Sequence, residues 1–218
     1  MTHCQIRTES ETTMKLFSKL IAICLLLVAP LWASASSIGQ LKGFSSTARS
    51  ASGTFTQTLI RSGHATKTSS GSFVFSRPGK FIWKYHSPYV QTLQSDGVSL
   101  YIYDKDLNQV TIKRLGAALG SSPAAILFGS NNLERNFKLR DLGPNDGCEW
   151  VEAVPRLRDT QFSRINIGMQ NGMPRAMELY DAMGNKTVVN FTGFKKNPPV
   201  NAGAFRFAIP KGADVFRR

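Results

Sequence analysis

Hydrophobic and polar residues alternate along most of the chain after residue 50, which predicts β-strands. In residues 71–85 (GSFVFSRPGKFIWKY), the aromatic side chains occupy odd positions on both sides of a Pro-Gly turn signal. Because successive strand residues point to opposite faces, this row predicts two strands that share a buried aromatic face. Arg77 lies in the same row, and burying its guanidinium costs free energy unless acceptors are present. Arg77 therefore either points to solvent beyond the strand end or has a partner inside.

Further alternating segments predict strands along the rest of the chain. Apart from the two strands of residues 71–85, they are residues 54–60, 89–95, 98–103, 109–113, 136–142, 149–154, 162–169, 175–181, 186–194 and 204–209. Residues 61–67 are polar and contain glycine, which predicts a hairpin loop. Short turns such as Asp96-Gly97 favour antiparallel pairing. We expect a mainly β (α+β) fold of about eleven strands, in a sheet that curls strongly or closes.

Helical spacing appears near the beginning of this region. Ile38, Leu41, Phe44 and Ala48 recur at helical intervals behind a pair of serines at residues 36–37 that can cap a helix. We expect a short amphipathic helix over residues 36–49, weakened by its two glycines.

A second helical signal interrupts the strands at residues 116–129 (GAALGSSPAAILFG). Ser122 can cap a helix, Pro123 suits its first position and Gly129 can end it. The turn is apolar all round, so both of its sides must be covered. We expect it to act as a lid on the curled sheet, formed by Pro123, Ala124, Ala125, Ile126, Leu127 and Phe128.

Residues 1–35 have the pattern of a secretory signal. Basic residues after Met14 precede a short apolar run, which ends in a small-x-small cleavage site at residues 33–35. We expect a signal peptide over residues 1–35, with an over-extended start before Met14. Residues 36–218 should then form a single exported, soluble domain.

Removal of the leader leaves a strongly basic domain with one cysteine. It takes away three basic and two acidic residues, leaving 24 Lys and Arg against 12 Asp and Glu, a net charge of +12. Such a charge favours anionic surfaces, but export and the scattered basic positions argue against nucleic acid and suit a solvated basic surface. Cys148 alone remains, so no intramolecular disulfide can form; pairing between chains stays open.

The sequence offers little support for catalysis or metal binding. His64 and His86 stand outside any recognisable nucleophile or metal motif, and the pattern GxSxG is absent. We expect no enzyme activity, no catalytic residue, no metal and no cofactor. A hydrolase that uses His86 with a distant serine and aspartate is a weaker alternative.

Several motifs resemble one known family, the periplasmic outer-membrane lipoprotein carriers of the LolA family. The motifs are GTFTQ (53–57), GSFxFxRPGxFxW (71–83), SDGxxLYxYD (95–104), GSSPAAIL (120–127) and GAFRFxIPKGADV (203–215). They run in order through the whole chain after the leader, and RPGxFxW is fairly specific.

The resemblance implies an incomplete antiparallel β-barrel with a short helical lid over a hydrophobic cavity that holds acyl chains. It implies a periplasmic carrier, expected to be a monomer, that takes acylated outer-membrane lipoproteins from an inner-membrane ABC transporter to an outer-membrane lipoprotein receptor. Arg77 matches the arginine that hydrogen-bonds the lid, as a lid latch. The residues expected to line the cavity or meet the cargo are Phe73, Phe75, Phe81, Trp83, Tyr85 and Leu100. A periplasmic regulator that senses lipids or lipoproteins with the same open barrel is the alternative.

Overall fold

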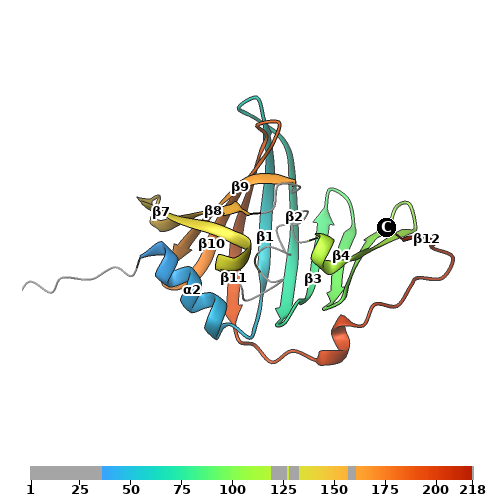
Figure 1. Cartoon of the computed structure of the whole chain (residues 1–218). Helices are drawn as coiled ribbons and strands as arrows, with labels where there is room; N and C mark the ends of the chain where they lie inside the picture. Colours follow the sequence, from blue (N-terminus) through green and yellow to red (C-terminus); the bar gives the residue numbers. More distant parts are fainter. Residues whose placement is uncertain (1–35, 119–126, 128–132, 157–160, 218) are drawn as a thin grey trace, which may run out of the picture. The chain divides into compact units, whose positions relative to one another are not determined.

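The computed structural model describes residues 36–118, 127, 133–156 and 161–217. Strands dominate this part of the chain and join in one 12-stranded sheet (Figure 1). The strands are β1 (Ser50–Arg61), β2 (His64–Ser76), β3 (Lys80–Ser87), β4 (Gln91–Asp96), β5 (Ser99–Asp104), β6 (Gln109–Arg114), β7 (Phe137–Asn145), β8 (Cys148–Pro155), β9 (Phe162–Gln170), β10 (Met173–Asp181), β11 (Lys186–Lys196) and β12 (Asp214–Arg217). The helical segments are α2 (Ser37–Thr47), α3 (Leu115–Ala118), α5 (Leu133–Asn136) and the 3₁₀ turn η1 (Ala202–Phe205). No helix in the described ranges is long and apolar enough to cross a membrane.

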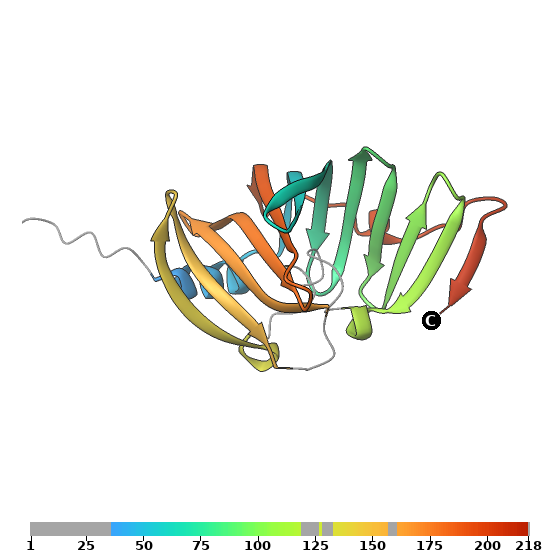
Figure 2. The ribbon, with the colours of Figure 1, turned by 90° about the horizontal axis from the view of Figure 1, so that it is seen from above.

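The sheet curls without closing (Figure 2). Its strand order is β12-β6-β5-β4-β3-β2-β1-β11-β10-β9-β8-β7, so the two ends are different strands that do not pair. Every neighbouring pair is antiparallel except β12 and β6, which run parallel. The expected mainly β fold, a curled and incomplete antiparallel barrel, is confirmed; the parallel edge strand is an addition.

Two local predictions are wrong. Residues 204–209 do not form a strand: η1 occupies their start, and Gln94 Nε2 donates to the Ala204 carbonyl oxygen at 3.4 Å. Phe205 is 2% exposed, and the Phe207 and Tyr101 rings are stacked with their centroids 4.7 Å apart. The alternating pattern therefore reflects packing of these side chains and not hydrogen bonding to a neighbouring strand.

Residues 61–67 are not a loop either. Strands β1 and β2 continue to a two-residue turn in which Ser62 and Gly63 have φ of 48° and 79°, as tight hairpin turns require. Polar residues are compatible with strands here, because this end of the hairpin is exposed to solvent.

Helix α2 packs on the inner face of the sheet, the face that carries Phe73 and Trp83. Its predicted position is confirmed, with Ser36 as N-cap. Leu41, Phe44 and Ala48 are each at most 2% exposed, and the Phe44 ring meets those of Phe75 and Phe194 edge-on. The helix therefore owes its place to packing, which compensates for its glycines.

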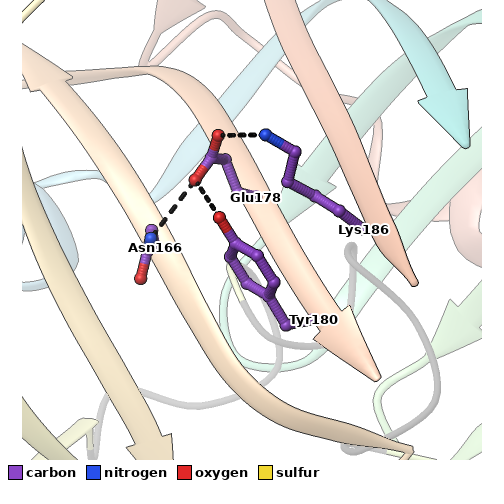
Figure 3. Close-up of polar contacts among 4 residues, drawn as sticks. All are labelled: Asn166, Glu178, Tyr180 and Lys186. Atoms are coloured by element: carbon purple, nitrogen blue, oxygen red, sulfur yellow. Dashed lines mark hydrogen bonds and ion pairs between the residues drawn. The ribbon is translucent and has the colours of Figure 1, made fainter. Parts of the chain in front are cut away.

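The outer face of β9–β11 carries a compact polar cluster (Figure 3). The Glu178 carboxylate accepts hydrogen bonds from Tyr180 Oη at 2.8 Å, Lys186 Nζ at 3.2 Å and Asn166 Nδ2 at 3.2 Å. Partial burial raises the pKa of Glu178, but hydrogen bonds from Tyr180 and Lys186 outweigh it, so the pKa lies below its ordinary value. The cluster therefore links three neighbouring strands most strongly while Glu178 is ionised.

Acid should weaken this link. A carboxyl whose pKa is depressed by folding stabilises the fold above its unfolded pKa of about 4.3 and loses that contribution as pH falls through the folded pKa. We expect Glu178→Gln to lower the free energy of unfolding at pH 7 by about 1 kcal/mol. Urea titrations from pH 7 to pH 3 should show the difference from wild type shrinking towards zero. A difference that does not change with pH would contradict this account.

Candidate functional site

The inner face of β1–β3 forms an aromatic wall, which we define as Phe55, Phe73, Phe75, Phe81, Trp83 and Tyr85. Cross-strand pairing places Phe75 beside Phe81 and Phe73 beside Trp83. These four side chains are 0–4% exposed, and Leu100 from β5 is fully buried in the same cluster. Tyr85 packs against that cluster while keeping part of its surface exposed. The structure thus brings together all the residues that the sequence suggested for a cavity lining.

The wall is built on ring stacking. Trp83 lies between Phe55 and Phe73, with ring centroids 4.0 Å and 5.9 Å away and interplanar angles of 26° and 23°. Tyr85 and Phe191 meet this stack edge-on. The sequence pattern places Phe55 on a strand face but does not assign it to the site. Its stacking partner Trp83 lies two strands away in the sheet, with β2 between them.

Gly71 makes the stack possible. A Cβ atom at this position would overlap the Lys84 carbonyl oxygen and lie 2.6 Å from Cζ of Phe55. Only glycine leaves room for the Phe55 ring to lie flat across β2 and reach Trp83.

Arg77 joins three segments at one end of the wall. Its Nε donates to the Ala48 carbonyl oxygen at the end of α2, and its Nη2 donates to the Leu127 carbonyl oxygen, both at 3.0 Å. The guanidinium carbon lies 5.4 Å from the centroid of the Phe75 ring. Burial lowers the pKa of Arg77 from its ordinary value, yet the group stays protonated at physiological pH. The sequence left open whether Arg77 points to solvent or has a partner inside, and the structure shows that it has partners inside.

Leu127 is the one residue of the predicted lid that the structure describes. Its side chain is 4% exposed and belongs to the same core cluster as the wall. Pro123, Ala124, Ala125, Ile126 and Phe128 lie outside the described residues. The contact between Arg77 and Leu127 is therefore observed, whereas the lid itself stays a prediction.

At the other end of the wall, the inner face opens into a pocket of about 370 Å³. Tyr85 belongs to both: its ring packs on the wall, and its hydroxyl donates to Gln57 Oε1 at 3.0 Å. Lys67 Nζ lies 4.7 Å from the centroid of the Tyr89 ring. The pocket lining is Gln57, Leu59, Lys67, Ser69, Tyr85, Pro88, Tyr89, Gln91, Asp104 and Thr187.

The other residues considered for chemistry lie elsewhere. His86 Nε2 is 2.9 Å from Ser72 Oγ, but this pair lies on the outer face, away from the wall and the pocket. Burial raises the pKa of Cys148, which disfavours a reactive thiolate. Among the described residues, no group of three or more His, Cys, Asp or Glu side chains could hold a metal ion.

The sequence is similar to known proteins over most of its length. A family model described as "Outer membrane lipoprotein carrier protein LolA" matches residues 46–208. An outer-membrane lipoprotein carrier protein of Cupriavidus necator is 57% identical over 190 residues, which covers 85% of this chain and 90% of the relative. One of Nitrosospira multiformis is 42% identical over 204 residues, covering 93% and 99%. In fold, an uncharacterised conserved protein of Thermus thermophilus matches 84% of this chain and 100% of its own, with a TM-score of 0.53 at 13% identity.

Replacing glycine by alanine should have opposite effects at two positions. Gly71→Ala forces Phe55 and the β2–β3 backbone apart, so we expect it to lower the free energy of unfolding by about 3 kcal/mol. Gly43 lies in α2, and a Cβ atom added there would meet no atom within 4 Å, so Gly43→Ala should raise that free energy by up to about 1 kcal/mol. Urea denaturation followed by tryptophan fluorescence measures both. Equal effects of the two substitutions would argue against the close packing at Gly71.

Proposed function

Because the chain belongs to the outer membrane lipoprotein carrier protein LolA family, we propose that it carries lipoproteins through the periplasm. It accepts acylated outer-membrane lipoproteins released by an inner-membrane ABC transporter, shields their acyl chains, and delivers them to an outer-membrane receptor. Residues 1–35 direct its export and are removed as a signal peptide. The observation that carries the proposal is the aromatic wall, which Arg77 connects through a hydrogen bond to Leu127.

Shielding an acyl chain from water is strongly favourable, at about 0.8 kcal/mol per methylene. A chain of about fifteen methylenes would gain roughly 12 kcal/mol if fully buried. A rigid apolar cavity open at all times would hold such cargo too tightly to release it. A carrier therefore needs a competing state that lowers the net affinity.

The closed wall provides that competing state. All of its aromatic side chains except Tyr85 are at most 4% exposed, and Leu127 belongs to the same buried cluster, so an acyl chain must displace side chains of this cluster to reach them. Displacement exposes the Leu127 side chain, at about 1.5–3 kcal/mol, and breaks a hydrogen bond to a charged donor, at about 1.5–3 kcal/mol. Closure recovers these contributions when the cargo leaves, so the cargo passes to a receptor that has no such competing state.

Arg77→Leu should separate loading from delivery. Without the Arg77 hydrogen bonds the closed state is less stable, so the variant should load lipoprotein at least as well as wild type. We expect its transfer to receptor-containing liposomes to slow about tenfold, because a loss of about 1.4 kcal/mol in the stability of the closed state corresponds to that factor. Arg175→Leu, an exposed arginine on β10, is the matched control and should transfer normally. Normal transfer by purified Arg77→Leu carrier would contradict this mechanism.

Cargo binding itself has a direct readout. Mass spectrometry of the protein isolated from the periplasm should find acylated polypeptides bound to it, and these should pass to acceptor membranes. Bound lipid or lipoprotein that is never transferred would favour the sensing regulator. Ester hydrolysis abolished by His86→Ala would favour the hydrolase.

A further inference from the structure

The inner face of the sheet changes from apolar to polar along its strands. Side chains two residues apart share a face, and cross-strand neighbours do so as well. The same change occurs in the same direction on four strands. Starting at the Arg77 end, the order is Phe75, Phe73, Ser69 and Lys67 on β2; Phe81, Trp83 and Tyr85 on β3; Leu100, Ile102 and Asp104 on β5; and Phe191, Val189 and Thr187 on β11.

The polar end of this gradient coincides with the pocket beside Tyr85. Residues from six strands and the β3–β4 connection line it, so it is part of the curled face and not of one loop. Tyr85 marks the boundary: its ring meets Phe55 and Trp83, while its hydroxyl turns to Gln57. A ligand with apolar tails and a polar end would find matching surfaces in this order along the face.

The charges of the pocket indicate which polar groups it would take. Oδ1 of Asp104 accepts from the backbone N–H groups of Asp106 and Leu107 at 3.1 Å and 3.2 Å, so this oxygen is occupied by its own turn. Lys67 is exposed and makes no ion pair within the described part of the chain. Its ammonium rests on the Tyr89 ring and can still donate hydrogen bonds. The pocket therefore suits oxygen acceptors.

We propose that this pocket binds the polar end of the acylated cargo, through the ester and amide carbonyl oxygens that join the acyl chains to the N-terminal residue. Lys67 donates to these oxygens, and the tails extend along the wall towards Arg77. This assignment rests on the proposed carrier function and adds an orientation to it. The competing closure at Arg77 then acts on the tails, and Lys67 acts on the opposite end of the same ligand.

The test compares two probes on purified protein. One is a synthetic lipopeptide with a triacylated S-glyceryl cysteine and a neutral peptide; the other is a fluorescent hydrocarbon-tailed dye without carbonyl groups. Lys67→Glu should weaken lipopeptide binding at least tenfold and leave dye binding within twofold, and Lys67→Gln should fall between. Lys84→Glu is the matched control, because Lys84 is exposed on β3 and points to the outer face. Unchanged urea denaturation would verify that each variant is folded.

The outcomes separate the two proposals. Wild type that fails to bind the lipopeptide would overturn the carrier function. Wild type that binds it, while Lys67→Glu binds equally well or Lys84→Glu is equally impaired, would leave the carrier function standing and overturn the polar pocket. A phospholipid offers the same carbonyl oxygens, so phosphatidylglycerol forms a third arm. A loss confined to phosphatidylglycerol would also overturn the assignment to lipoprotein cargo.

Discussion

The buried charge of Arg77 ties together segments of the structure that lie far apart in the sequence. A guanidinium that cannot lose its proton must find acceptors when it leaves water. Here two of them are main-chain carbonyls, at Ala48 after α2 and at Leu127, so one side chain links β2 to segments 29 and 50 residues away. Moving either segment leaves part of the guanidinium without an acceptor. The observed arrangement is therefore favoured by specific hydrogen bonds, and in the proposed mechanism these are what an apolar ligand has to displace.

The alternation of strand residues lets one sheet carry two unrelated surfaces. The inner face holds the aromatic wall, which grades into the pocket beside Lys67. The outer face of β9–β11 holds the cluster around Glu178, whose groups bond to one another across three strands. Substitution of Glu178 on the outer face should therefore change stability, whereas substitution of Lys67 on the inner face should change which ligand the protein binds.

The sequence allowed the wall to be predicted because Phe73, Phe75, Phe81 and Trp83 follow a strict period of two, and because Arg77 breaks that pattern. Features that depend on distant contacts could not be predicted. The stack of Phe55 on Trp83 requires Gly71 on the strand between them, and β12 pairs parallel with a strand about a hundred residues earlier. Lys67 was assigned to a loop because its neighbours are polar. The turn at Ser62 and Gly63 instead extends the hairpin and turns Lys67 to the inner face.

The extension of the β1–β2 hairpin, which carries Lys67, changes the physical description of the carrier. A wall that was apolar from end to end would bind tails in either direction, and its affinity would depend on methylene count alone. A wall with a polar end distinguishes the ends of its ligand, because a tail placed beside Lys67 and Gln57 would leave their polar groups without partners. Under the proposal, this orientation places the tails where closure at Arg77 can compete with them. In the proposed mechanism, the hydrogen bond at one end is effective because the chemistry at the other end determines which part of the ligand it meets.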